Sequence, residues 1–448
     1  MTKRVSSARE LALQVLLAVE GEGAYAGIAL AMSLSASELD KRDKAFVTEL
    51  VNGVLRRQIT LDYLLNLFLK KPVDSLPLPI AEILRLSLYQ LAYLEKIPAS
   101  AAVNEAVELA KRYGHQGTAA LVNGVLRNYL RQKEQITFPD QQKEPAKFLA
   151  VYYSLPQWIV ELLLEQWTLA ETEQFCAYQA ESHKIIIRTN TLKISRYELC
   201  KKLLAAGYIA QPCRYAPDGL ELASGAGLFD EQLFTSGLLT IQDESSQLAA
   251  LALLPQKGGK VIDLCAAPGG KATYLAQLMD NQGQIIACDL HKHRVGLIKE
   301  NCDRLGTTCV KPLATDGLEL PLNYINWADY LLLDAPCSGL GVLSRRADSR
   351  LRKEKNDLAE LAELSYKLLL AAADYLNFGG IMVYSTCTIT KAENEDNIAR
   401  FLSARADYEL IDLPENFPIK QDRRGILQIL PQKQGIEGFF IARLRRKV

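Results

Sequence analysis

Two cysteines stand in polar loops where a sulfur atom could act as a nucleophile. Cys337 lies in the run DAPCSG at residues 334–339, and Cys387 lies in the run STCT at residues 385–388. A cysteine inside an apolar segment is usually a small buried side chain, and we interpret the cysteines at 176, 200, 213, 288, 302 and 309 in this way. A thiolate attacks electron-poor carbon and forms covalent intermediates. The two loops therefore predict covalent catalysis, and the residues alone do not say which cysteine attacks.

A loop rich in small residues is the candidate binding site for a ligand with an anionic group. It follows a strand-like run and precedes a helix-like run, and its sequence is CAAPGGK. Small residues let the backbone approach a ligand, and a helix N-terminus favours negative charge. The carboxylate in the methionine part of S-adenosylmethionine fits such a site. The members of the loop are Cys265, Ala266, Ala267, Pro268, Gly269, Gly270 and Lys271.

Two acidic residues follow the next two strand-like runs. Asp289 stands where an acid of a Rossmann-like unit accepts hydrogen bonds from ribose hydroxyls. Asp316 stands after the third run and is suited to an adenine amino group. A single Asp at such a point is about as often a helix N-cap, but two on successive strand ends favour nucleotide binding. The fingerprint G-x-G-x-x-G is missing, which argues against an NAD-linked enzyme.

These residues all fall at the ends of strands in a repeated strand–helix pattern. The pattern predicts strands at 260–264, 284–288, 308–313, 330–333 and 380–384, and helices at 270–279, 292–305, 352–376 and 391–404. Such alternation implies a doubly wound parallel sheet, whose ligands bind beyond the carboxyl ends of the strands. Cys337 and Cys387 then follow adjacent strands at the ligand-binding edge.

The remainder of the chain predicts two further domains. Residues 1–130 have helical periodicity, so an all-helical domain is placed at 1–140, and the apolar stretch at 11–19 is interpreted as an amphipathic helix rather than a signal peptide. A polar segment with two prolines at 132–148 marks a boundary. Residues 149–235 mix helix and strand and suit a small α+β module, and residues 236–448 form the α/β domain. No segment approaches the about 20 apolar residues of a membrane span.

The net charge and the spacing of the cysteines limit which ligands and binding partners the sequence can predict. Lys and Arg number 52 and Asp and Glu also number 52, so any RNA-binding surface must come from local clustering. No two cysteines have C-x-x-C spacing, so neither a zinc site nor a disulfide framework is expected, and a reducing cytoplasm fits best. One basic cluster follows the Cys337 loop and predicts contact with RNA phosphates. Its members are Arg345, Arg346, Arg350, Arg352 and Lys353.

Taken together, the motifs resemble a known family over essentially the whole chain. CAAPGGK at 265–271, DAPC at 334–337, STC at 385–387, QDESS at 242–246 and the terminal GFF at 438–440 resemble the bacterial RNA cytosine-C5 methyltransferases. The resemblance is closest to the RsmB (Sun or Fmu) family of 16S rRNA enzymes. It implies an all-α NusB-like RNA-binding domain, an RRM-like middle module and a Rossmann-like class I methyltransferase domain.

The resemblance also implies roles for the site residues. Cys387 would be the nucleophile that adds to carbon 6 of cytosine, and Cys337 would assist breakdown of the covalent adduct and product release. S-adenosylmethionine would be held by the 265–271 loop with Asp289, Asp316 and Asp334. Lys271 and Asp334 would also touch the target base.

Several alternatives remain open at this point. The substrate implied by the NusB-like extension is 16S rRNA, of the cytosine-967 type, but tRNA or 23S rRNA would need the same chemistry. A protein of another class, an RNA-binding or ribosome assembly factor without activity, is disfavoured by the intact loop, acids and cysteines. The target base must leave its stack, so a single-stranded or loop target is expected. A monomer without metal or membrane contact is expected.

Overall fold

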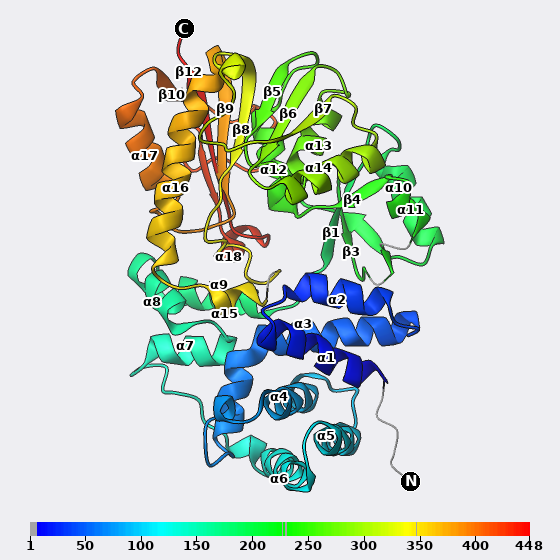
Figure 1. Ribbon diagram of the computed structural model, residues 1–448. Helices are drawn as coiled ribbons and strands as arrows, with labels where there is room; N and C mark the ends of the chain where they lie inside the picture. Colours follow the sequence, from blue (N-terminus) through cyan, green and yellow to red (C-terminus); the bar gives the residue numbers. More distant parts are fainter. Residues whose placement is uncertain (1–6, 226, 229–230, 346) are drawn as a thin grey trace. The chain divides into compact units, whose positions relative to one another are not determined.

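The computed structural model describes residues 7–225, 227–228, 231–345 and 347–448 (Figure 1). Contacts between residues divide the chain into two compact units. The first unit extends to Ser182 and also contains Leu343–Lys353, and the second contains His183–Val342 and Glu354–Val448. No helix among the described residues has the length and apolar character that crossing a membrane requires.

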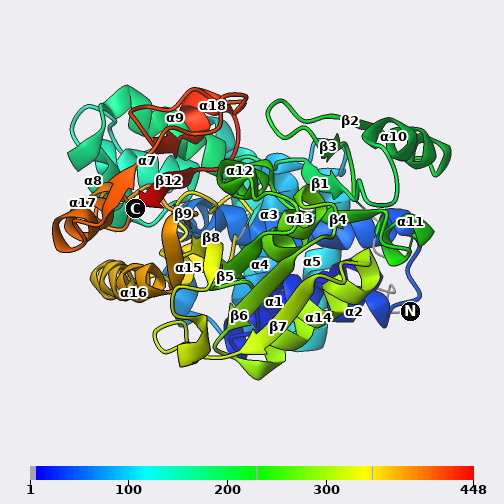
Figure 2. The ribbon, with the colours of Figure 1, turned by 90° about the horizontal axis from the view of Figure 1, so that it is seen from above.

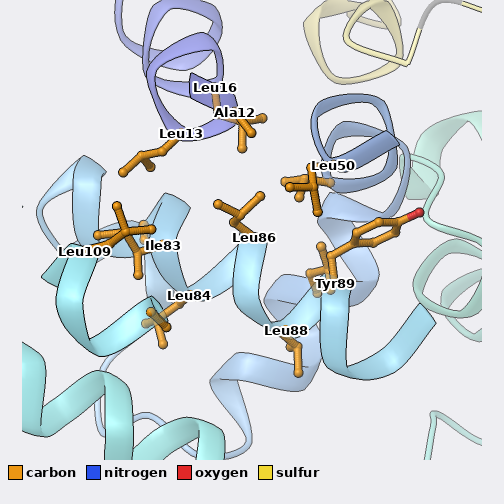
Figure 3. Packing of buried hydrophobic residues seen from close by; sticks show 14 of the residues in the cluster. Ala12, Leu13, Leu16, Leu50, Ile83, Leu84, Leu86, Leu88, Tyr89 and Leu109 are labelled. Carbon is orange, nitrogen blue, oxygen red and sulfur yellow. The ribbon is translucent and has the colours of Figure 1, made fainter. Parts of the chain in front are cut away.

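The first unit is entirely helical. Amphipathic helices bury one face each against a shared core, part of which is drawn in Figure 3. Leu13 and Leu16 of one helix, Leu50 of another and Leu86 of a third are fully buried in this core. The helices are α1 (Ser7–Gly21), α2 (Ala26–Ser35), α3 (Lys41–Asn66), α4 (Leu78–Tyr93), α5 (Ala99–Tyr113), α6 (Gln116–Gln132), α7 (Pro145–Tyr153), α8 (Gln157–Gln166), α9 (Leu169–Ala180) and α15 (Ser349–Arg352).

The limits of this unit differ from the ranges expected from the sequence. The sequence places helices α8 and α9 in the middle module, whereas by their contacts α7, α8 and α9 group with the helical unit. The short segment Leu343–Lys353 also belongs to it, although it lies within the α/β domain in sequence. Composition marks the polar linker well, but it does not reveal which core a helix beyond the linker joins.

The second unit begins with a small antiparallel sheet. Its strands are β1 (Ile185–Thr189), β2 (Ala210–Pro212), β3 (Gly219–Leu222) and β4 (Leu239–Ile241), in the order β2-β3-β1-β4. Helix α10 (Arg196–Ala205) covers one face, and its N-terminus is a capping box in which Ser195 and Glu198 bond each other's backbone N–H. Helix α11 (Gln232–Thr235) precedes β4. The expected α+β module is therefore present.

A second, larger sheet carries the strand ends that the sequence singled out. Its order is β10-β12-β9-β8-β5-β6-β7, with β11 also paired to β12. The strands are β5 (Lys260–Asp263), β6 (Gln284–Asp289), β7 (Val310–Ala314), β8 (Ala328–Asp334), β9 (Leu376–Thr386), β10 (Tyr408–Leu410), β11 (Ile426–Ile429) and β12 (Phe439–Arg446).

The expected parallel sheet is present in five strands, and the last strands to join it are antiparallel. Strands β9, β8, β5, β6 and β7 run parallel, whereas β12 is antiparallel to β9, β10 and β11. Strand β12 follows β11 after only the short helix α18 (Pro431–Gln434), which is too short a crossover for a parallel pair. Because of this reversal, the start of β12 at Phe439 lies beside the end of β9.

Helices cover both faces of the large sheet (Figure 2). Side chains alternate along each strand, so Val261 faces one core while Ile262 faces the other. One core includes α12 (Glu244–Leu253), α13 (Gly270–Leu278) and α14 (Lys292–Leu305), and the other includes α16 (Asp357–Ala372) and α17 (Glu395–Ala404). The helix expected at 352–376 is broken between α15 and α16.

Candidate active site

The loop between β5 and α13 has a backbone that only small residues permit. Gly269 has a φ of +98°, and a Cβ there would lie 3.2 Å from the Cα of Ile298. The N–H of Ala266 donates to the Cys288 carbonyl at 2.8 Å, which ties the loop to β6. Burial raises the pKa of Cys265, so this cysteine stays a thiol. A small residue is therefore required at Gly269, and the binding of a donor by residues 265–271 stays a prediction.

The two acids after β6 and β7 differ in their surroundings. Asp289 is buried, accepts a hydrogen bond from the N–H of His291 at 3.1 Å and pairs with Arg294 at 3.4 Å. Asp316 is exposed and accepts from the N–H of Leu318 at 2.9 Å. Each carboxylate thus makes the local backbone bond of a capping acid, and both stand at the same edge of the sheet as the loop.

An ion pair joins the glycine-rich loop to the end of β8. The ammonium of Lys271 lies 2.7 Å from Asp334, and the hydroxyl of Ser385 donates to the other carboxylate oxygen at 2.9 Å. Burial alone would lower the pKa of Lys271, but the Asp334 carboxylate outweighs it and the pKa is raised. Lys271 also lies 5.5 Å from the centre of the Phe439 ring. A fixed positive charge therefore stands within the site.

The two cysteines of the polar loops lie next to each other. The sulfur of Cys337 is 3.4 Å from the sulfur of Cys387, a contact distance well above the about 2.05 Å of a disulfide bond. The hydrogen bond to Cys387, followed by burial, raises the pKa of Cys337 well above its usual range. Cys337 therefore keeps its proton in the resting protein.

The loops that carry the cysteines approach each other and the start of β12 closely. The N–H of Gly341 donates to the carbonyl of Cys387 at 3.0 Å, and the N–H of Gly438 donates to the carbonyl of Gly341 at 2.9 Å. A Cβ on Gly341 would lie 2.1 Å from the oxygen of Gly438, and a Cβ on Gly438 would lie 2.8 Å from the Cα of Gly341. The glycine of the terminal GFF motif is thus required by close packing of backbones.

Two residues of the site were missed by sequence reasoning. Asp263 at the end of β5 is fully buried, and neither carboxylate oxygen has a hydrogen-bond partner among the described residues. Arg188 of β1 donates to the Gly270 carbonyl at 2.6 Å and to the Thr273 hydroxyl at 3.0 Å. An acid inside the apolar run KVIDL was a usable signal, whereas nothing in the sequence links Arg188 to a loop 80 residues away.

The expected RNA contact of the basic cluster is wrong for Arg350. Its side chain is fully buried, and its guanidinium donates to four backbone carbonyls of the helical unit. Arg352 donates to three further carbonyls, those of Val19, Gly23 and Ala24. Because carbonyls at loop and helix ends need donors, these arginines act as structural groups. Arg345 and Lys353 are half-buried, and Arg346 lies outside the described residues.

Comparison with known proteins assigns the family. The chain is 40% identical to the probable ribosomal RNA small subunit methyltransferase B of Bacillus subtilis, over 99% of each chain. The chain belongs to the ribosomal RNA small subunit methyltransferase B family. A member of this family from Synechocystis, also described as probable, is 40% identical over 98% of this chain and 99% of its own length.

Three family models match separate parts of this chain. The NusB family matches residues 6–131, a ferredoxin-like domain of RsmF/B-like methyltransferases matches residues 155–228, and 16S rRNA methyltransferase RsmB/F matches residues 250–445. The family and the three folds predicted from the sequence are therefore confirmed.

Two solved structures are similar in fold to all or part of this chain. The crystal structure of PH0851 is 26% identical with a TM-score of 0.84 and covers 99% of this chain and 100% of its own. NSun6 from Pyrococcus horikoshii with SFG is 26% identical with a TM-score of 0.59, and covers 65% of this chain and 98% of its own. The fold of this chain is thus found over its whole length in PH0851.

Proposed function

We propose that this protein transfers a methyl group from S-adenosylmethionine to carbon 5 of one cytosine in 16S rRNA, through a covalent bond to Cys387. The observation that carries the proposal is the pair of sulfurs 3.4 Å apart beside the Lys271–Asp334 ion pair. These groups share the edge of the sheet where doubly wound folds bind ligands. The family's rRNA methyltransferase function supports an RNA substrate.

Residues at the same edge suit the methyl donor. The small residues of the 265–271 loop would let the methionine part approach its backbone, and the carboxylates of Asp289 and Asp316 would accept hydrogen bonds from ribose and adenine. Asp263 supports this fit, because a buried carboxylate without a partner is costly until a donor group such as an ammonium pairs with it. When bound, S-adenosylmethionine supplies an electrophilic methyl group on a positively charged sulfur.

Four residues of this chain would each have a separate role at the target cytosine. The Cys387 sulfur forms a bond to carbon 6 of cytosine, which breaks the ring conjugation and makes carbon 5 nucleophilic. The Lys271 ammonium stabilises negative charge near that sulfur, and Asp334 holds the edge of the ring. After methylation, Cys337 in its thiolate form accepts the carbon-5 proton, and the electron pair of that C–H bond restores the double bond and expels the Cys387 thiolate. Cys337, next to that sulfur, assists this breakdown.

The first test is the position of the methyl group. Purified protein with S-adenosylmethionine and naked 16S rRNA is expected to yield 5-methylcytosine at a single site, of the cytosine-967 type, which mass spectrometry of RNA fragments locates. Assembled small subunits, tRNA and 23S rRNA serve as parallel substrates. Methylation of tRNA or 23S rRNA in place of 16S rRNA would show that the same chemistry acts on another RNA. If no RNA substrate is methylated, the protein is better explained as a ribosome assembly factor without activity.

A pH-dependent stability is expected from Asp263. Burial and then the nearby Asp334 raise its pKa from 3.8 to about 8. The folded chain therefore holds a proton that the unfolded chain has lost, so the free energy of unfolding falls as pH rises from about 4 to about 8. Asp263→Asn should remove this decline and weaken binding of S-adenosylmethionine at least about tenfold, through loss of a charged hydrogen bond.

Denaturant titrations across this pH range and calorimetric titration with the donor measure both effects. The matched control is Asp280→Asn, an exposed acid in a left-handed turn that asparagine tolerates. Unchanged donor affinity in Asp263→Asn would remove this residue from the donor site.

A further inference from the structure

A second buried acid lies behind the two cysteines and has no part in the mechanism above. Glu393 is fully buried, six residues after Cys387 and just before helix α17. Its carboxylate makes no hydrogen bond to either sulfur. It does accept hydrogen bonds from the residue that directly follows each cysteine. This arrangement makes it a candidate positioning residue.

The carboxylate of Glu393 accepts two hydrogen bonds from the loop that carries Cys337. One oxygen accepts from the N–H of Ser338 at 2.6 Å, and the other accepts from the Ser338 hydroxyl at 2.6 Å. Ser338 is the next residue after Cys337 and is itself buried. Two bonds from one carboxylate to one residue fix both the backbone and the side chain at that point.

The same carboxylate also accepts hydrogen bonds from the loop that carries Cys387. It accepts from the hydroxyl of Thr390 at 2.6 Å and from the hydroxyl of Thr388 at 3.2 Å. Thr388 directly follows Cys387, and its hydroxyl lies 2.7 Å from that of Ser338. A single buried charge therefore binds the two cysteine loops to each other.

Neighbouring groups keep Glu393 itself in place. The hydroxyl of Tyr384 donates to the Glu393 carbonyl at 2.6 Å. Asn394 accepts from the hydroxyl of Thr386 at 2.6 Å and donates to the carbonyl of Thr388 at 3.2 Å. Because these partners lie on β9 and just after it, the backbone at Glu393 and Asn394 is tied to the strand and loop that carry Cys387.

We propose that Glu393 is a positioning residue that holds the sulfurs of Cys337 and Cys387 in contact by bonding the residue after each. The inference rests on the proposed function of the two cysteines. Two consequences follow, one from geometry and one from charge. A shift of about 1 Å between reacting groups lowers rates by up to about a hundredfold. The negative charge of Glu393 also contributes to raising the pKa of Cys337, after the hydrogen bond to Cys387 and burial.

The test compares Glu393→Gln with wild-type protein in single-turnover methyl transfer and in breakdown of the RNA adduct. Glutamine keeps the size of the side chain but loses its charge and one acceptor. We expect both rates to fall between about ten- and a hundredfold. We also expect the pH inflection of adduct breakdown to move to lower pH, because removing a negative charge lowers the pKa of Cys337.

Further variants separate positioning from simple loss of structure. Asp396→Asn is the matched control, since Asp396 is exposed on the next turn, and it should keep both rates. Thr390→Val removes one bond to the carboxylate and keeps its charge, so its rates should fall by less and its pH inflection should stay. If Glu393→Gln is unfolded by circular dichroism, a Thr390→Val variant with wild-type rates would overturn the inference.

A wild-type pH inflection in folded Glu393→Gln would also overturn it. The proposed function is tested separately, by trapping RNA on protein that retains Glu393. An adduct at Cys387 with no effect of Glu393→Gln would leave the proposed function standing and remove only the positioning role.

Discussion

Replacing Cys387 with alanine is expected to abolish methyl transfer to RNA. Without the sulfur, no covalent bond to carbon 6 forms and carbon 5 stays a poor nucleophile. Loss of a covalent nucleophile costs at least about a thousandfold in turnover, because the remaining groups cannot replace the step. Transfer of a labelled methyl group from S-adenosylmethionine to 16S rRNA measures the loss.

The control for this change is another cysteine of the same chain. Cys200→Ala alters a partly buried thiol on α10, outside the candidate site, and should keep wild-type activity. Binding of S-adenosylmethionine to Cys387→Ala should also be unchanged, since Cys387 is not among the groups assigned to the donor. A Cys387→Ala protein with full methyl transfer would refute the covalent mechanism.

Replacing Cys337 with alanine is expected to have the opposite effect on the RNA complex. Cys387 can still add to the base and one methyl group can still be transferred, but breakdown of the adduct is slowed. The covalent protein–RNA complex should then accumulate, and turnover beyond the first cycle should stop. Denaturing electrophoresis after reaction with donor and RNA detects the complex as a slower band.

The double variant identifies the source of that band. Adding Cys387→Ala to Cys337→Ala should remove the complex entirely, because the attacking sulfur is gone. A Cys337→Ala protein that turns over normally and traps no RNA would show that the contact between the sulfurs serves no step of the reaction.

The positions of the site residues could be predicted because parallel strands bring their carboxyl ends to one edge. Cys337 and Cys387 follow β8 and β9, and these strands are neighbours with Asp334 opposite Ser385. Local patterning of apolar residues was enough to place the strands, and hence the loops. The ranking of the two cysteines came only from the family resemblance.

Other features depend on contacts distant in the chain, which local patterning does not reveal. The reversal at β12 depends on pairing with β9, and without it the GFF motif has no visible reason to lie beside Cys387. Arg350 was predicted to contact RNA phosphates because its neighbours in the sequence are basic. In fact its partners are carbonyls from residues 56, 154, 179 and 343. A charge cluster in a sequence therefore does not by itself indicate an exposed surface.

The most direct measurement of the central proposal is the site of attachment of RNA in the Cys337→Ala complex. After nuclease and protease digestion, tandem mass spectrometry assigns the peptide that carries the nucleotide and the atom of attachment. We expect a methylated cytosine bound to the sulfur of Cys387 and to no other residue. A nucleotide attached to a different cysteine, or a complex that also forms in Cys387→Ala, would contradict it.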